Sequence, residues 1–347
     1  MPLTDLSEDT LAALLLCGDF DREGCDALRP FSPREYAALV TLLRERTSRP
    51  GDVLQVGLGG SFHREVGPGG FHVERFSALL GRRDALAVAF EGWESIGLWV
   101  MSVHDADYPG MLLTRLGRSA PPILYGAGPR ALVGGGGLAI VGSRGADDAA
   151  LSFAGRVACL CAHHGVTAVS GGSRGVDREA LLGALRSGGR AVGVLSDSLA
   201  RTSTGNEYGD FLRTDRLTLI SPYGPDGPFS VGSAMGRNRH TYALANRALV
   251  VSCEHRKGGT WAGAVENLRK GWVPLLVRDG EGVPDGNRAL VQMGALPVPE
   301  GTPGAVLEGW SHDRIAGAAT EETRSGKPHG KPGRPRQAQS APARDVL

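Results

Sequence analysis

Cysteine is scarce in this sequence, and its spacing gives no metal-binding pattern. Five cysteines occur among 347 residues, and they form no CxxC pair and have no histidine partner at the spacing of metal ligands. Cys159 and Cys161 lie in an apolar helical run, where both are expected to be small core residues. The pattern favours neither a zinc site nor a disulfide framework, and we expect no metal and no cofactor.

Long apolar runs are also missing. No run approaches the roughly 20 residues that a transmembrane helix needs. The N-terminal residues are acidic, whereas a signal peptide begins with basic residues followed by apolar ones. The sequence therefore predicts a cytoplasmic protein that does not enter a membrane.

An excess of one charge sign is absent as well. Lysine and arginine number 38 against 37 aspartate and glutamate residues, which gives a formal net charge of +1. Such a chain has no global field that attracts nucleic acid, so any polyanion site must be a local patch. Hydrophobic residues at 41% and charged residues at 22% predict a globular protein with a substantial core. The 52 glycines are roughly double the usual share and indicate many tight backbone approaches.

The chain divides into three regions by pattern. Residues 1–95 predict a small helical domain, in which Ser7 and Ser32 are candidate N-caps and Pro33 takes a first helical position. Residues 96–310 alternate short β-rich runs with helices. Residues 311–347 are rich in glycine, proline and basic residues and contain almost no large apolar ones, so we expect a disordered basic tail.

The middle region predicts an α/β fold. Strands are expected at 97–103, 138–143, 166–171, 190–196, 217–221, 248–253 and 273–277. Because these runs are apolar throughout and separated by helices, they imply a parallel sheet covered on both faces. We therefore expect an extended Rossmann-like, doubly wound and mostly parallel sheet, preceded by the small α-helical domain. Ligands in such sheets bind at the carboxyl ends of the strands.

Glycine and arginine gather where expected strands meet expected helices. VGSRG (141–145) and SGGSRGVD (170–177) each follow a strand, GRNRH (236–240) precedes a helix, and KGGTWAGA (257–264) opens another. Helix N-termini present unpaired N–H donors and the positive end of the helix dipole. In a parallel sheet these turns converge on one edge. Neither GxGxxG nor a Walker lysine motif occurs in these turns, so the prediction of a phosphate site depends on the turns acting together.

Seven blocks, in this order, resemble the DNA-processing protein A (DprA/Smf) family. They are DYPGMLLTRLGRSAPPILYGAG (107–128), AIVGSRG (139–145), VSGGSRGVDREALLGAL (169–185), AVGVL (191–195), LISPYGPDGPF (219–229), GRNRHTYALANRALVV (236–251) and GGTWAGAVENLRKGWVPLLV (258–277). The resemblance implies a Rossmann-like domain that binds single-stranded DNA and self-associates as a homodimer. It also implies a role in DNA recombination and natural transformation, with a RecA-type recombinase as partner, and no catalytic reaction.

The turns and the resemblance together place the DNA phosphates on four motifs. The GSR motif comprises Gly142, Ser143 and Arg144. The Ser-Gly-rich loop comprises Ser170, Gly171, Gly172, Arg174, Gly175 and Asp177. The Arg-Asn-Arg motif comprises Arg237, Asn238 and Arg239, and the last turn comprises Gly259 and Thr260. Asp177 is expected to cap the helix that follows its loop, and orientation of Arg174 is its alternative role.

Aromatic residues near these motifs are candidate platforms for stacked bases. Tyr223, Phe229 and Trp261 are such candidates, whereas Tyr242 is expected to lie in the core. The chain departs from the family by ending in the tail where many members carry a winged-helix-like domain. A divergent member that acts in phage defence is therefore an alternative to a transformation protein.

Three further functions remain open on the sequence alone. The stretch GGTWAGAVE (258–266) is loosely similar to the PGGxGTxxE signature of nucleoside-monophosphate phosphoribohydrolases, and Glu266 would be its general acid or base. A nucleotide-binding sensor of that superfamily is the related alternative. The last option is a structural interaction protein without affinity for nucleic acid.

Overall fold

The computed structural model describes residues 3–20, 28–55, 73–227 and 230–310. The first helices begin where side chains cap them. At the start of α1 (Glu8–Cys17), Ser7 Oγ accepts a hydrogen bond from Thr10 N at 3.1 Å. At the start of α2 (Pro33–Glu45), Ser32 and Glu35 form a reciprocal capping box, and Pro33 is the first helical residue. Both predicted helix starts are confirmed.

The remaining N-terminal elements are η1 (Leu3–Asp5), η2 (Pro50–Leu54), α4 (Val73–Leu80) and α5 (Arg83–Ser95). Polar side chains connect this part of the chain to the first strand and the loop after it. Thr10 Oγ1 donates to Asp105 Oδ1 at 2.7 Å, and Tyr36 Oη lies 2.8 Å from His104 Nε2. Residues Met1–Trp310 form one compact unit. The division predicted between residues 95 and 96 stays a prediction.

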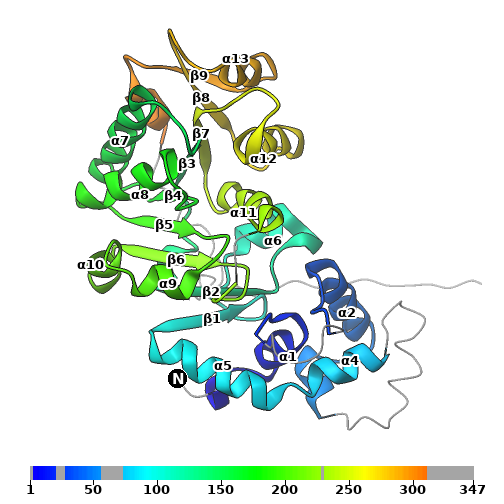
Figure 1. Ribbon diagram of the computed structural model, residues 1–347. Helices are drawn as coiled ribbons and strands as arrows, with labels where there is room; N and C mark the ends of the chain where they lie inside the picture. The colour runs from blue at the N-terminus through cyan, green and yellow to red at the C-terminus, as the bar shows by residue number, and fades with distance from the viewer. Residues whose placement is uncertain (1–2, 21–27, 56–72, 228–229, 311–347) are drawn as a thin grey trace, which may run out of the picture. The chain divides into compact units, whose positions relative to one another are not determined.

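A nine-stranded sheet forms the centre of the described fold (Figure 1). Its strands are β1 (Leu98–Ser102), β2 (Ile123–Ala127), β3 (Leu138–Gly142), β4 (Ala168–Ser170), β5 (Ala191–Val194), β6 (Leu217–Ser221), β7 (Arg247–Ser252), β8 (Leu275–Asp279) and β9 (Leu296–Pro299). Their order is β1-β2-β6-β5-β4-β3-β7-β8-β9. The strands from β6 to β9 in this order are parallel, whereas β1 and β2 are antiparallel to their neighbours. The predicted mostly parallel α/β fold is confirmed.

Two strands were not predicted from the sequence. β2 contains Gly126, which lowers strand propensity, although Trp99 of β1 packs over that position and leaves no room for a side chain there. β9 reads LPVP, and prolines argue against a strand unless it lies at a sheet edge. β9 is an edge strand.

Alternate residues of β3 contact helices on opposite faces of the sheet. Leu138 and Ile140 belong to the buried cluster that includes α7 (Asp148–His163) and α8 (Val176–Arg186). Ala139 and Val141 belong to the cluster that includes α11 (Val231–Ala243) and α12 (Gly258–Lys270). Side chains of a strand alternate between faces, so the sheet is covered on both faces, and Figure 1 shows the two helix pairs on either side of it. The doubly wound arrangement is confirmed.

The other helices are α6 (Gly110–Leu116), η4 (Gly117–Ser119), η5 (Arg130–Leu132), α9 (Leu199–Thr204), α10 (Gly209–Arg213), α13 (Asp285–Gln292) and η6 (Pro303–Leu307). Across the described ranges, no helix has the length and apolar character needed to cross a bilayer. The same ranges hold no group of three or more histidine, cysteine, aspartate or glutamate side chains arranged to bind a metal. The predicted disordered tail at 311–347 lies outside the described residues.

Candidate nucleic-acid interface

The turn after β3 lies against the turn after β4. Gly142 ends β3, and a Cβ there would lie 2.6 Å from Val176 at the start of α8. Gly175 has φ +81°, and its Cβ would lie 2.5 Å from Ser143 O. Only glycine combines this backbone conformation with so close an approach. The two predicted phosphate turns therefore meet, as the parallel sheet requires.

Ser170 is buried and stabilises the sheet. Its Oγ donates to Ile140 O at 2.6 Å, which ties β4 to the neighbouring β3. Gly171 is also buried, and a Cβ at this position would overlap the guanidinium of Arg237. Gly172, with φ +67°, faces Leu195. The glycines of this loop thus make room for protein groups, and Arg174 beside them is exposed to solvent.

Arg237, one of the predicted phosphate-binding residues, is buried in an ion pair with Asp177. The residue is 4% exposed, and Nη1 lies 3.4 Å from Asp177 Oδ2 and 3.2 Å from Val194 O. Asp177 Oδ2 also accepts a hydrogen bond from Ser173 Oγ at 2.8 Å. Burial raises the pKa of Asp177, against the opposing influence of Arg237 and Ser173. The pair joins α11 to the first turn of α8.

The expected capping role of Asp177 is wrong. The N-cap of α8 is Gly175, which has no side-chain cap, and Asp177 is the second residue of the helix. The motif GRNRH does not precede a helix either, because it lies inside α11 (Val231–Ala243). Three consecutive helical residues project about 100° apart. Arg237, Asn238 and Arg239 therefore point in different directions, and no single groove holds all three.

Asn238 connects α11 to the first turn of α12. Its Nδ2 donates to Gly259 O at 2.8 Å. α12 begins at Gly258, and its N-cap, Lys257, provides no side-chain cap. The first N–H groups of this helix thus have no side-chain partner at the cap position, where the helix dipole favours an anion. Arg256, directly before, has φ +56°, a conformation that side chains rarely adopt outside functional or tightly held turns.

These parts enclose a pocket of about 580 Å³, which we call the α12 pocket. Eight of the predicted phosphate-binding residues line it: Gly142, Ser143, Arg144, Asp177, Arg237, Asn238, Gly259 and Thr260. Six do not line it: Ser170, Gly171, Gly172, Arg174, Gly175 and Arg239. Arg239 lines a different pocket, on the other side of α11.

The α12 pocket includes cations that the prediction left out. Arg256 and Lys257 line it together with Arg144, and all three are exposed. Lys257 also pairs with Glu254, Nζ to Oε2 at 2.8 Å, at the surface. The signal in the sequence for Arg256 and Lys257 is their position directly before Gly258, Gly259 and Thr260. The pocket is thus lined by cations beside an uncapped helix N-terminus.

The aromatic residues considered as stacking platforms lie in different parts of the structure. Trp261 lines the α12 pocket, is half-buried, and meets the ring of His255 edge-on with centroids 4.9 Å apart. Tyr242 is 1% exposed, as expected for a core residue. Tyr223 lines the other pocket, and Phe229 lies outside the described residues. Trp261 is therefore the candidate platform that the α12 pocket contains.

The part of the chain that contains the sheet matches known proteins. A family model described as DNA recombination-mediator protein A matches residues 99–301, which span β1 to just past β9 and more than half of the chain. No curated protein matches this sequence.

Two solved structures show the same fold. DNA processing protein A from Streptococcus pneumoniae superposes with a TM-score of 0.66 at 19% identity, over 88% of this chain and 98% of that one. DNA processing protein A from Helicobacter pylori, described for its single-stranded DNA binding mode, superposes with a TM-score of 0.51 at 22% identity, over 62% and 97%. By the extent of the family match, this chain belongs to the DNA recombination-mediator protein A family.

Proposed function

We propose that this protein binds single-stranded DNA, with the phosphate backbone at the α12 pocket. The observation that carries the proposal is the grouping of Arg144, Arg256 and Lys257 around the uncapped start of α12. Cations and unpaired helix N–H groups at one place supply affinity for phosphate that is independent of base sequence. Ser143, which also lines the pocket, adds a hydroxyl donor.

Trp261 would stack one base of the strand. Its indole lies in the wall of the α12 pocket, a few residues after Arg256 and Lys257. Stacking on an aromatic side chain contributes about 1–3 kcal/mol per base and tolerates every base. The backbone cations and this ring together fit a strand with unpaired bases better than a duplex, whose bases are stacked on one another.

In this proposal the site performs no chemical reaction. Asp177, the buried carboxylate of the pocket, is already paired with Arg237 and Ser173. Glu266, which a phosphoribohydrolase would use as acid or base, does not line the α12 pocket. This favours binding over hydrolysis. In keeping with its family, we further propose a role in recombination, in transformation or phage defence, as a homodimer that acts with a RecA-type recombinase.

The test is a salt titration of binding to oligo(dT). Replacing one phosphate-binding arginine should lower the slope of log K against log [salt] by ~0.7, the value expected for one contact to a single strand. Arg144→Ala and Arg256→Ala should each do so. The matched control is Arg186→Ala, an exposed arginine in the last turn of α8, the end of that helix away from its Gly-rich turn.

The outcome that overturns the proposal is specific. If both variants keep the parental affinity and salt slope, the α12 pocket is not the phosphate site. Release of free base from nucleoside monophosphates by the purified protein would instead support the hydrolase. Absence of oligo(dT) binding at low salt would leave the structural interaction protein as the better reading.

A further inference from the structure

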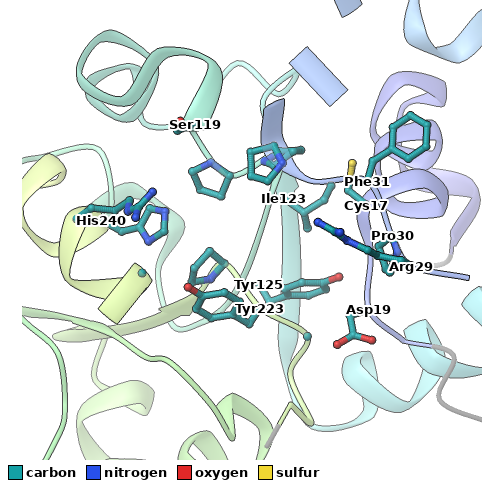
Figure 2. Close-up of a pocket in the computed structure, with 17 residues that line it drawn as sticks. Cys17, Asp19, Arg29, Pro30, Phe31, Ser119, Ile123, Tyr125, Tyr223 and His240 are labelled. Atoms are coloured by element: carbon teal, nitrogen blue, oxygen red, sulfur yellow. The ribbon is translucent and has the colours of Figure 1, made fainter. Parts of the chain in front are cut away.

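The two sides of α11 line two different pockets. Gly236, Arg239 and His240 line a pocket of about 560 Å³, and Figure 2 shows His240 on the α11 side of it. The residues of α11 that line the α12 pocket instead are Ala234, Met235, Arg237, Asn238 and Tyr242. Among these, Asn238 is half-buried and is the one whose side chain donates a hydrogen bond to α12.

The first turn of α12 is held weakly by its own sequence. The helix opens with Gly258 and Gly259, and glycine loses more conformational freedom on folding than any other residue. The N-cap, Lys257, provides no side-chain cap. On either side of it the backbone is left-handed, with φ +56° at Arg256 and φ +78° at Gly258. A contact from outside the helix is therefore needed to fix this turn in one place.

Asn238 supplies such a contact. Its Nδ2 donates to Gly259 O at 2.8 Å, and within the described ranges this is the one side-chain hydrogen bond to the backbone of residues 258–262. Because a carbonyl oxygen can only accept, the bond determines which end of the Asn238 amide faces α12. A Cβ at Gly259 would lie 3.0 Å from Asn238 Nδ2, so glycine leaves the room that this bond requires.

The rest of α12 is held to α11 by apolar packing. A Cβ at Gly263 would lie 3.1 Å from Asn238 Cβ and 3.1 Å from Tyr242 Cε2, so the two helices approach closely there. Tyr242 and Ala264 belong to the same buried apolar cluster. The body of α12 therefore stays against α11 without the amide, and the Asn238 bond determines where the first turn lies.

We propose that Asn238 is a positioning residue for the α12 pocket. Through Gly259 O it holds the first turn of α12 so that the unpaired N–H groups of that turn and the side chains of Arg256 and Lys257 meet one phosphate. Asn238 itself does not contact the DNA. A site that is ordered before binding loses less conformational entropy when its ligand binds, so the bond adds affinity without adding a contact. This inference rests on the proposed function, which places a phosphate at that turn.

The experiment replaces Asn238 with leucine, which has a similar volume and no hydrogen-bonding atom. Binding of oligo(dT) and of an abasic strand of the same length is measured across a salt titration. Both strands should bind about two- to tenfold more weakly to Asn238→Leu, the range expected for the loss of one hydrogen bond. The salt slope should keep its parental value, because every cation remains. Asn238→Ser, whose hydroxyl is too short to reach Gly259 O, should lose the same affinity, which separates the lost bond from any strain that leucine introduces.

Amide hydrogen exchange separates positioning from direct contact with the strand. In an α-helix the N–H of Gly263 donates to Gly259 O, so this amide should exchange faster in Asn238→Leu than in the parent, with no DNA present. Asn246→Leu is the matched control. Asn246 Oδ1 accepts a hydrogen bond from Gly137 N at 2.7 Å just before β7, at the end of that strand away from the α12 pocket. The control should keep the parental affinity for both strands and the parental exchange rate at Gly263.

The inference is overturned if Asn238→Leu binds both strands as the parent does, or if Gly263 exchanges at the parental rate. It is also overturned if only oligo(dT) binds more weakly, since Asn238 would then contact a base. Arg144→Ala tests the phosphate site independently. A lower salt slope in Arg144→Ala, together with parental binding by Asn238→Leu, refutes this inference alone. A parent that binds neither strand refutes the proposed function and this inference together.

Discussion

Replacing Arg237 with methionine tests whether its guanidinium supports the fold or contacts DNA. The residue is 4% exposed and its Nη1 lies 3.4 Å from Asp177 Oδ2. Without it, the Asp177 carboxylate stays buried and loses its counter-charge. Breaking a buried ion pair in this way costs about 3–5 kcal/mol, a large share of the ~5–15 kcal/mol that keeps a domain folded. Methionine retains an apolar stem, so the loss of stability reflects the removed charge more than a cavity left by the shorter side chain.

Urea unfolding measures the loss. Arg144→Met, at an exposed position of the same pocket, is the matched control and should change the free energy of unfolding by less than about 0.5 kcal/mol. Adding Asp177→Asn to Arg237→Met should recover part of the stability, because it removes the unpaired charge; the double-mutant cycle then gives the coupling energy. The reasoning is refuted if Arg237→Met unfolds at the parental urea concentration and loses only oligo(dT) binding.

The pH dependence of this variant has a defined sign. Burial already raises the pKa of Asp177 above 3.8, against the pull of Arg237. Removing Arg237 raises that pKa further. A carboxyl whose pKa is raised on folding keeps its contribution to stability below the unfolded-state pKa and loses it as the pH rises through the folded-state pKa. The deficit of Arg237→Met should therefore be smallest near pH ~4 and largest at neutral pH.

Three further changes test other parts of the molecule. The Arg75 guanidinium, 2.7 Å away, holds the pKa of Glu35 at about 2 instead of 4.5. Its contribution is therefore present above pH 4.5 and is lost as the pH falls toward 2; Glu35→Gln should cost about 1 kcal/mol at pH 7, after allowance for partial exposure, and flatten the acid limb of the stability curve. Gly175→Ala should destabilise by more than ~1 kcal/mol in thermal unfolding, since its φ is +81° and a Cβ would lie 2.5 Å from Ser143 O. Trp261→Ala should weaken oligo(dT) binding by about 1–3 kcal/mol with little change in salt slope, and quenching of tryptophan fluorescence by DNA that is present in the parent and lost in Trp261→Ala would locate the contact. Equal affinity of Trp261→Ala and parent would exclude stacking on this ring.

Most of the sheet is predictable because its strands are buried on both faces. Runs such as LAIVGS and ALVVSC are apolar without alternation, which is typical of parallel strands, and they correspond to β3 and β7. β2 and β9 were not predicted because other constraints determine their residues. Gly126 leaves space for the Trp99 ring. The prolines of β9 are compatible only with an edge strand, and a single sequence does not show which strand lies at an edge.

The sequence predicts which turns form the site but not where each side chain points. The convergence of the β3 and β4 turns follows from parallel topology, and the close approach at Gly175 agrees with it. The direction of each arginine does not follow from the motif. Arg-Asn-Arg within a helix sends Arg237 into the core and Arg239 to another pocket, as the 100° step per residue requires once the motif is recognised as helical. Treating it as a turn concealed that periodicity.

The two prolines of β9 also limit how copies of this protein can associate. Glu300 N donates to Asp279 O of β8, so backbone N–H groups at even positions point inward, and Pro297 and Pro299 occupy the outward positions. That border therefore has no N–H donor at these residues, and the Pro299 carbonyl already accepts a hydrogen bond from Thr302 N at 3.0 Å. Another chain cannot extend the sheet there by a regular hydrogen-bonded ladder. Association at this border must use side chains, among which Leu296 is 57% exposed and Met293 48%.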